Sequence, residues 1–346
     1  METHNQCPSC GGELSFDPNS GDLKCSHCGQ KTSFNENNTS NLKRAYDQFS
    51  SIRTQKATNT QYTCSSCGRT HISGVDNELT RCPSCGSPNL ERTLNIEYIP
   101  DGVIPFKINQ ENAIQMYRAW IKKKKFAPNN LKRLAKLQGL TARYVPVYNY
   151  DFMCTSHYYG TGTETVGMGD NRRTRRIRFN DTRTDVFNNY LDSACSELSS
   201  HELRKFGNYN FGDVKVYKTE YLYGFIASQI QVDLHTSCAN TRQSVINEIH
   251  QKIKSSLSCS IETFHCDTNF NYVRYNYLYV PMWTSVYKYK DKTYHCYING
   301  QTGKASGRAP KSVWKILGVV LFWIAIGAAA AYLALFSGDV SISFGR

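Results

Sequence analysis

The sequence lacks several patterns that would place it in a common class of enzyme or secreted protein. It has no G-x-x-x-x-G-K-[ST] run, so it carries no P-loop for nucleotide phosphates. Its first ten residues, METHNQCPSC, contain no apolar stretch like that of a signal peptide, so we expect no secretory export. Acidic side chains are scarce, with 28 Asp and Glu against 41 Lys and Arg. The formal charge of +13 suits a partner with phosphate groups, either an anionic membrane surface or nucleic acid.

Cysteine, by contrast, is abundant, and eight of the fourteen cysteines form two copies of one pattern. Each copy reads C-x2-C, fourteen residues, C-x2-C, and a glycine follows the second cysteine of every C-x2-C pair. Two such turns facing each other complete a tetrahedral site of four thiolates. The spacing therefore predicts two structural zinc ions, one in a zinc ribbon over 1–35 and one in a ribbon over 61–95. The ligands are Cys7, Cys10, Cys25, Cys28, Cys64, Cys67, Cys82 and Cys85.

Two other interpretations of the cysteines are weaker. Disulfides would need an oxidising compartment, to which nothing at the N-terminus directs the chain. A catalytic zinc ion would keep an open coordination position, whereas four thiolates close the site. His27 lies inside a C-x2-C turn, but four cysteines already satisfy the metal, so we expect an exposed polar side chain there.

The C-terminal part contains one long apolar run. Residues 316–336 carry no charge and are long enough, as a helix, to cross a bilayer, whereas a buried soluble helix is seldom apolar on every face. A cluster of cations precedes the run, and only Asp339 and Arg346 follow it. The positive-inside rule predicts a single-pass protein of the cell membrane, with the bulk of the chain in the cytoplasm and a short tail, 337–346, outside. The preceding cations are Lys304, Arg308, Lys311 and Lys315.

Between the ribbons, residues 36–60 are expected to form a linker that contains a short amphipathic helix. Apolar residues recur there at steps of three and four, and the flanking segments NENNTS and TNTQ are typical of flexible linkers. The two ribbons are therefore expected to move relative to each other. The apolar positions of the helix are Leu42, Ala45, Tyr46, Phe49 and Ile52.

Residues 96–310 are expected to form an α+β core domain. Helices are predicted over 110–125, 130–138 and 239–257, and alternating aromatic residues over 142–160 and 271–289 predict a half-exposed antiparallel sheet. The buried stripe of the first helix comprises Ala113, Ile114, Tyr117, Trp120 and Ile121.

Three blocks of the sequence carry a family resemblance: VIPFKINQENAIQMYRAWIKKKKFAPNNLKRL, YVPVYNYD and YLYVPMWTSVYKYKDKTYHCYINGQTGKASGRAPKS. Over nearly its whole length the chain resembles the bacterial YdjG-like, TFIIB-type zinc ribbon-containing membrane proteins, some of which are labelled PriA-like helicases. The characteristic positions are Pro105, Phe106, Ala113, Trp120, Pro128, Pro281, Trp283, Asn299, Gly300, Thr302, Gly303, Gly307 and Pro310.

The resemblance implies a cytoplasmic membrane adaptor or scaffold, because such proteins often accompany SPFH-domain and phage-shock-type membrane-stress proteins. Its expected partners are membrane-associated proteins, with the bilayer itself bound through 316–336. The helicase label is not supported, because the chain has no P-loop and its 346 residues leave no room for motor domains.

Other candidate sites are few. The glycine-rich segment 160–170 lacks the spacing of a dinucleotide site and is expected to be a mobile loop. The pairs His265–Cys266 and His295–Cys296 suggest a nucleophile and its base, but neighbours on a strand point to opposite faces. The remaining cysteines are expected to be small buried or half-buried residues of a reducing cytoplasm. They are Cys154, Cys195, Cys238, Cys259, Cys266 and Cys296.

A run of five arginines within seven residues is either a solvated hairpin tip or a contact for phosphates of lipid or nucleic acid. It supports, as the alternative to an adaptor, a membrane-tethered zinc-ribbon protein that binds nucleic acid. An enzyme ranks third, because no set of acid, base and nucleophile stands out. The arginines are Arg172, Arg173, Arg175, Arg176 and Arg178.

Overall fold

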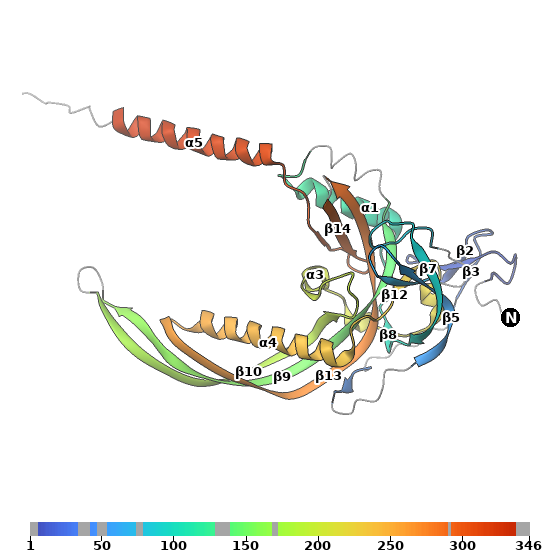
Figure 1. Cartoon of the computed structure of the whole chain (residues 1–346), viewed down its shortest axis with the longest axis horizontal. Coiled ribbons are helices and arrows are strands. Elements are labelled where there is room, and N and C mark those ends of the chain that lie inside the picture. Colours follow the sequence, from blue (N-terminus) through green and yellow to red (C-terminus); the bar gives the residue numbers. More distant parts are fainter. Residues whose placement is uncertain are drawn as a thin grey trace, which may run out of the picture.

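The chain folds into a body with two projections, a long curved arm of three strands and a C-terminal helix (Figure 1). The computed structural model describes residues 6–33, 42–46, 54–73, 79–128, 139–167, 172–289 and 292–336. The helices are α1 (Gln110–Lys123), α3 (Ser200–Phe206), α4 (Leu234–Ser256) and α5 (Val313–Phe336), with short 3-10 helices η2 (Phe211–Asp213) and η3 (Thr219–Leu222).

Most strands join one large sheet. The strands of the N-terminal part are β1 (Leu14–Phe16), β2 (Leu23–Cys25), β3 (Lys31–Thr32), β4 (Arg44–Ala45), β5 (Thr54–Cys64), β6 (Thr70–Ser73) and β7 (Leu90–Tyr98). Those of the rest are β8 (Gly102–Val103), β9 (Thr141–Val166), β10 (Arg173–Ser193), β11 (Lys215–Val216), β12 (Ile226–Ser228), β13 (Ser260–Tyr289), β14 (Lys292–Asn299) and β15 (Ala305–Gly307).

The sheet is built around β13 and β9, which pair antiparallel along nearly their whole length. Its main path runs β11-β8-β13-β9-β12-β6-β5-β7, while β10 pairs with β9, and β14 and β4 pair with β13. Strands β1, β2 and β3 form a separate small sheet. The mixture of helices and a mainly antiparallel sheet agrees with the predicted class, although β12 pairs parallel with β9 and β8 parallel with β13.

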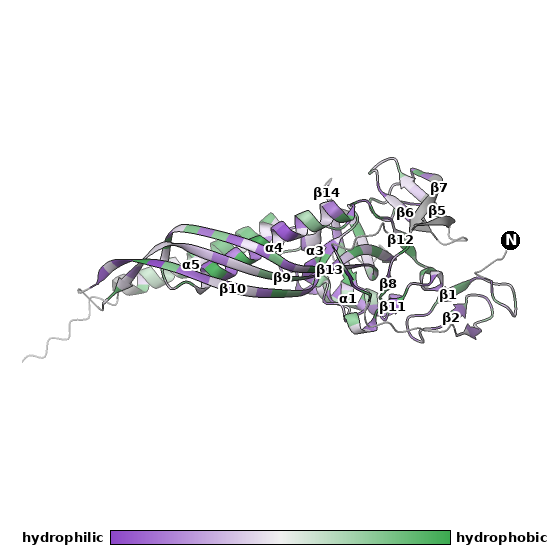
Figure 2. Cartoon of the chain, turned by 90° about the horizontal axis from the view of Figure 1, so that it is seen from below, coloured by the Kyte–Doolittle hydropathy of each residue, from purple (hydrophilic) through white to green (hydrophobic). Residues whose placement is uncertain are grey.

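The arm consists of residues 151–166 of β9, 173–187 of β10 and 260–274 of β13, with α4 lying along it (Figure 1). In β9, residues 143–150 are all buried in the body, whereas burial alternates from Asp151 to Tyr159. One face of the arm therefore packs under α4 and the other meets solvent. Figure 2 shows the same alternation as green and purple stripes along the arm.

Helix α4 covers the inner face of the arm with one apolar stripe. Val245, Ile249 and Ile253 are fully buried at steps of four residues, against the aromatic side chains of β9 and β13. Asp233 caps the helix by accepting a hydrogen bond from the backbone N–H of Thr236 at 2.9 Å. Helix α1 confirms the helix predicted over 110–125, and α4 confirms the one predicted over 239–257 with an earlier start. The helix predicted over 130–138 lies outside the described residues.

Two expectations are wrong. The helix across the 36–60 linker is absent from its described parts, because Arg44–Ala45 pairs with β13 and residues 54–60 belong to β5. The expected relative motion of the two N-terminal modules stays a prediction, although both modules contact the body in the structure. The segment 160–166 is not a mobile loop but the end of β9, while 168–170 lies outside the described residues.

The glycines of that segment are required by close packing of the strands. A Cβ atom at Gly160 would lie 2.1 Å from the carbonyl oxygen of Thr263, and one at Gly162 would lie 2.8 Å from the carbonyl oxygen of Ser260. Any side chain there would push β13 away from β9. The tail 337–346 and the segment NENNTS also lie outside the described residues.

Candidate metal centres

The structure brings the eight predicted cysteines together in two groups of four. Module 1 comprises residues 6–33, and module 2 comprises residues 54–73 and 79–98. In each tetrad the ligand atoms all lie within 4.8 Å of one another. The sulfurs of Cys10 and Cys25 are 3.5 Å apart, and those of Cys67 and Cys82 are 3.7 Å apart. Ligands about 2.3 Å from a tetrahedral ion are separated by about 3.8 Å, whereas bonded sulfurs are about 2.0 Å apart. Each tetrad thus fits one metal ion, and all eight thiols are free of disulfides.

Four copies of one turn build the two centres. The glycine after each C-x2-C pair donates its backbone N–H to the carbonyl of the first cysteine, as Gly11 does to Cys7 at 2.9 Å and Gly68 to Cys64 at 2.7 Å. These glycines have φ between 69° and 76°, in the left-handed region that favours glycine. The predicted role of these glycines is confirmed. The four are Gly11, Gly29, Gly68 and Gly86.

The electrostatics of the tetrads call for a cation. A hydrogen bond from the backbone N–H of Cys28 lowers the pKa of Cys25 to about 6. Although the backbone N–H of Gln30 favours its thiolate, the neighbouring sulfurs of Cys10 and Cys25 raise the pKa of Cys28 to about 12. Four thiolates cannot coexist at this distance without a positive charge among them, which a divalent ion supplies.

Module 1 is fixed to the body by its β1 strand. The backbone N–H of Phe16 donates to the carbonyl of Tyr223 at 3.0 Å. The Phe16 ring lies 5.4 Å from the ring of Tyr221 and 6.4 Å from that of Phe225, and Cys7 and Cys25 are buried in the same cluster. Loss of the metal ion would therefore disturb the packing of the body as well as the module.

Module 2 is fixed to the body by backbone pairing and by one buried histidine. Strand β6 pairs antiparallel with β12, which places His71 opposite Ser228. The fully buried His71 side chain has its Nε2 atom 3.5 Å from Sγ of Cys82 and its Nδ1 atom 2.9 Å from a carboxylate oxygen of Glu197. A histidine between a ligand sulfur and a carboxylate is the arrangement that orients metal ligands from outside the coordination sphere.

Glu197 also pairs with Arg143, whose side chain is 2% exposed. The cation of Arg143 compensates the buried carboxylate beside His71, so the three residues form one cluster between the second tetrad and the body. His71, Glu197 and Arg143 were not found by sequence reasoning. Only His71 carried a signal, as a histidine between the two C-x2-C pairs of its module.

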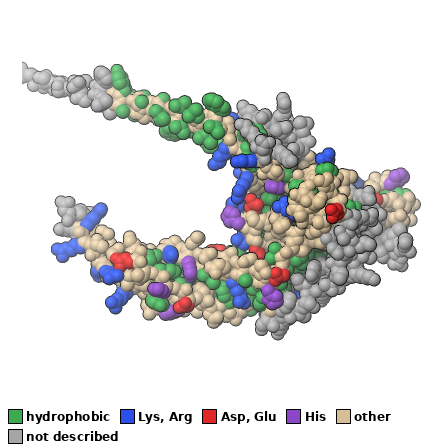
Figure 3. All heavy atoms as spheres, viewed as in Figure 1, with side chains coloured by type: hydrophobic (Ala, Val, Ile, Leu, Met, Phe, Trp, Pro, Cys, Tyr) green, Lys and Arg blue, Asp and Glu red, His purple; other side chains and the backbone are tan. Residues whose placement is uncertain are grey.

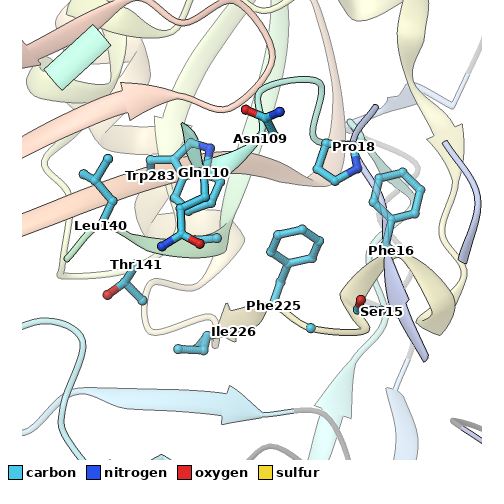
Figure 4. Close-up of a pocket in the computed structure, with 12 residues that line it drawn as sticks. Ser15, Phe16, Pro18, Asn109, Gln110, Leu140, Thr141, Phe225, Ile226 and Trp283 are labelled. Atoms are coloured by element: carbon cyan, nitrogen blue, oxygen red, sulfur yellow. The ribbon is translucent and has the colours of Figure 1, made fainter. Parts of the chain in front are cut away.

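A hollow of about 400 Å³ lies where module 1 meets the body, lined by residues of both (Figure 4). Its wall includes Phe16 of β1, Gln110 at the start of α1, and Phe225 and Trp283 of the body. None of its twelve lining residues is titratable, so this hollow holds no general acid, base or nucleophilic thiol.

The cysteines outside the tetrads lie as their sequence context predicts. Cys154, Cys195, Cys238 and Cys296 are buried, and burial raises the pKa of each thiol. Cys266 packs against the cluster under α4, whereas its neighbour His265 stacks on Tyr159 with ring centroids 5.1 Å apart. The two side chains of the His265–Cys266 pair therefore face opposite sides of the sheet.

The five arginines lie at the far end of the arm, where Figure 3 shows blue side chains at its tip. All five are exposed, at residue 172 and on the first part of β10. Two of them pair with acidic side chains across the strands, Arg175 with Glu164 at 3.2 Å and Arg176 with Glu262 at 2.9 Å. These two pairs offset two of the five positive charges that a phosphate would meet at the tip, and the other three arginines form no ion pair with the described acidic residues.

Helix α5 is long and apolar enough to span a bilayer. Residues Val313–Leu333 have a mean hydropathy of 2.3, and none of them is buried against the rest of the chain. Figure 3 shows its apolar side chains exposed along the described length. A core helix of a soluble protein would be covered by other elements, as α4 is.

The chain is similar to uncharacterized protein YdjG of Bacillus subtilis (strain 168). The two sequences are 26% identical over an alignment of 345 residues, which covers 95% of each chain. No model of a known protein family matches the chain, and no solved structure matches it. The similarity thus extends over nearly the whole length of both chains.

Proposed function

We propose that this protein is a zinc-ribbon adaptor, anchored in the cell membrane by α5, that binds other proteins at the cytoplasmic face. In this proposal the two tetrads hold structural zinc, because four thiolates close the coordination sphere and leave no position for a substrate or water. The assembly it would serve is of the membrane-stress type, with SPFH-domain or phage-shock-type proteins, as the family resemblance implies.

Anchoring is supported by the exposure of α5. An uncovered apolar helix of this length is unstable in water, and it is stabilised when its side chains are buried in the hydrocarbon core of a bilayer. Trp314, which is 82% exposed, lies at the end of α5 next to the body, where an aromatic side chain suits the membrane interface. Lys304, Arg308, Lys311 and Lys315 precede the span, which favours a cytoplasmic body.

The observation that carries the adaptor role is an apolar row on the outer face of the arm. Val186 of β10 and Tyr272 of β13 both pair with Met153 of β9, one on each side. Val186 is 59% exposed, Tyr272 is 37% exposed and Met153 is 40% exposed. A row of large apolar side chains across three strands, on a face otherwise rich in Thr, Asn and Asp, is typical of a protein-binding surface.

The shape of the arm supports the same conclusion. Beyond residues 273–275, where β4 and Tyr46 contact β13, the outer strands β10 and β13 pair only with β9, so most of both edges of the arm is open among the described residues. An open, charged edge and an apolar row on a rigid projection place a docking surface away from the body. Nucleic-acid binding is the alternative that the arginines at the tip favour.

The test is purification of the tagged full-length protein from membranes in mild detergent, with nuclease, followed by mass spectrometry. Wild type is compared with a Met153→Ser/Val186→Ser variant and with Thr182→Ala, an exposed position of the same strand. We expect a discrete set of membrane proteins that resists nuclease, is lost in the double variant and is kept by Thr182→Ala.

Other outcomes separate the alternatives. Partners that vanish with nuclease, whatever the variant, would show that the protein binds nucleic acid and that the adaptor proposal is wrong. A Cys64→Ser/Cys67→Ser variant is compared in the same experiment. If it alone loses the partners, module 2 rather than the arm is the docking surface.

A further inference from the structure

A basic pocket lies at the foot of α5. It encloses about 680 Å³ between the end of α1 with the turn that follows it and the segment between β15 and α5. These two segments are far apart in the sequence, and Figure 3 shows cationic side chains where α5 leaves the body. The pocket is separate from both cysteine tetrads and from the hollow beside module 1.

Five cations and no carboxylate line this pocket. Lysines at the end of α1 are accounted for by the helix dipole alone, but the dipole does not explain why a second segment brings two more cations to the same place. Oε1 of Glu202 lies 3.7 Å from Nε of Arg308 and offsets only that one charge. The electrostatic potential in the pocket is therefore positive, which favours binding of an anion. Its cations are Lys123, Lys124, Lys125, Arg308 and Lys311.

The floor of the pocket is apolar. Ala127 and Pro310 are buried, and the ring of Tyr294 stacks on that of Tyr287 with centroids 5.6 Å apart. The exposed side chain of Phe126 forms part of the wall. Cations around an apolar floor match a molecule with a charged head and a hydrocarbon part better than they match a free inorganic ion.

The pocket is held at the level where α5 would enter a bilayer. The backbone N–H of Ser312 donates to the carbonyl of Phe126 at 2.8 Å, and Nζ of Lys315 donates to the carbonyl of Ala127 at 2.6 Å. The first turn of α5 is thus pinned to the turn that carries the lysines. If α5 spans the membrane, these cations lie among the headgroups.

We propose that this pocket binds the headgroup phosphate of an anionic phospholipid. The inference rests on the proposed membrane anchoring and deepens it, but it does not depend on the adaptor role. The cations contact the phosphate, and the apolar floor takes the glycerol and the start of the acyl chains.

The experiment is native mass spectrometry of the full-length protein in neutral detergent, titrated with phosphatidylglycerol or with phosphatidylcholine. We expect one saturable phosphatidylglycerol adduct per chain and weaker binding of phosphatidylcholine. A Lys123→Gln/Lys125→Gln/Lys311→Gln variant should bind phosphatidylglycerol roughly 100-fold more weakly, from the typical contribution of one basic residue at an anionic surface.

The matched control removes the same charge elsewhere. Arg172→Gln/Arg173→Gln/Arg178→Gln changes three exposed arginines at the tip of the arm and should leave the adduct unchanged. Equal loss in both triple variants, or equal binding of the two lipids by wild type, would overturn the proposal. Two metal ions per chain in each variant show that it is folded, and the single variant Lys311→Gln replaces the triple variant if that condition fails.

Two further measurements distinguish failure of this inference from failure of the proposed membrane anchoring. Millimolar inorganic phosphate should not displace the lipid, and displacement would show that the pocket takes a free anion instead. Alkaline carbonate extraction of membranes tests anchoring by itself. A chain that carbonate releases would contradict the proposed function, whereas a chain that stays in the membrane but shows no headgroup preference contradicts only this inference.

Discussion

The two histidines of the cysteine modules have opposite surroundings. His27 is exposed between two ligands of module 1, whereas His71 is fully buried between a ligand sulfur of module 2 and Glu197. A buried imidazole in this position fixes the orientation of Cys82, and an exposed one fixes nothing. The metal ion of module 2 should therefore depend on His71 and Glu197, while that of module 1 should not depend on His27.

We expect His71→Gln to weaken metal binding at module 2 by about 10- to 100-fold, the typical effect of losing such a contact. Metal release to a chromophoric chelator measures the affinity of both sites in the detergent-solubilised protein. His27→Gln is the matched control and should release both ions like wild type. Equal release from wild type and His71→Gln would show that His71 only fills space.

Removing two ligands should remove one ion. Cys64→Ser/Cys67→Ser leaves module 2 with two thiolates, too few for a closed site, so we expect the metal content to fall from two ions per chain to one. Elemental analysis by mass spectrometry measures the content and also identifies the metal. Cys259→Ser changes a half-buried cysteine outside the tetrads and should keep both ions. Two ions in the Cys64→Ser/Cys67→Ser variant would contradict the assignment of its ligands.

The sequence predicted the tetrads but not the residues that support them. A C-x2-C pair is a local pattern, and its geometry follows from one tight turn whatever surrounds it. The contact of His71 with Glu197 depends instead on pairing of β6 with β12 and on the loop that follows β10. No local rule predicts which distant strands will pair, so these residues became visible only in the fold.

The arm is stable because α4 covers its inner face. Without α4 the three strands would expose their apolar inner face to water, and a sheet so narrow needs a covering helix to persist. Ile249 is fully buried at the centre of this contact, whereas Gln251, two residues along the helix, is exposed. The stability of the arm should respond to the first side chain and not to the second.

We expect Ile249→Ala to destabilise the packing of α4 on the arm by about 2–5 kcal/mol, the usual cost of such a cavity. Faster amide hydrogen exchange along residues 152–160 of β9 would report the loss locally. Gln251→Ala should leave that exchange unchanged, since exposed substitutions usually shift stability by less than about 0.5 kcal/mol. If Ile249→Ala also leaves it unchanged, the arm does not need α4.

Helices were easier to predict than the long strands. The buried stripe of α1 follows from the spacing of apolar residues in the helix itself, which places Ala113, Tyr117, Trp120 and Ile121 on one face. The segment at 54–61 has the polar composition of a linker, and it is a strand only because β7 and β6 pair with it. Likewise Gly160 and Gly162 suggested a loop, because the closeness of β13 is not visible in the sequence.

The arrangement of the two projections limits how the protein can sit on a membrane. Figures 1 and 2 both show α5 leaving the body on the same side as the arm. The arm carries exposed arginines and polar strands, which cannot enter hydrocarbon without a large cost in desolvation. If α5 inserts, it must therefore point away from the arm, and the arm stays in the aqueous phase beside the membrane.

This constraint predicts which side of the membrane the arm occupies. In inverted membrane vesicles, which expose the cytoplasmic face, trypsin should cut the full-length protein at the exposed arginines 172–178. In intact protoplasts the same sites should be protected, because the cations before α5 keep the body and the arm inside. Cleavage in detergent, where both preparations should give the same fragments, controls for the intrinsic susceptibility of the sites. Fragments from protoplasts would reverse the proposed orientation. Protection in both preparations, with cleavage only in detergent, would mean that the membrane itself shields the arm, and the conclusion that α5 points away from it would be wrong.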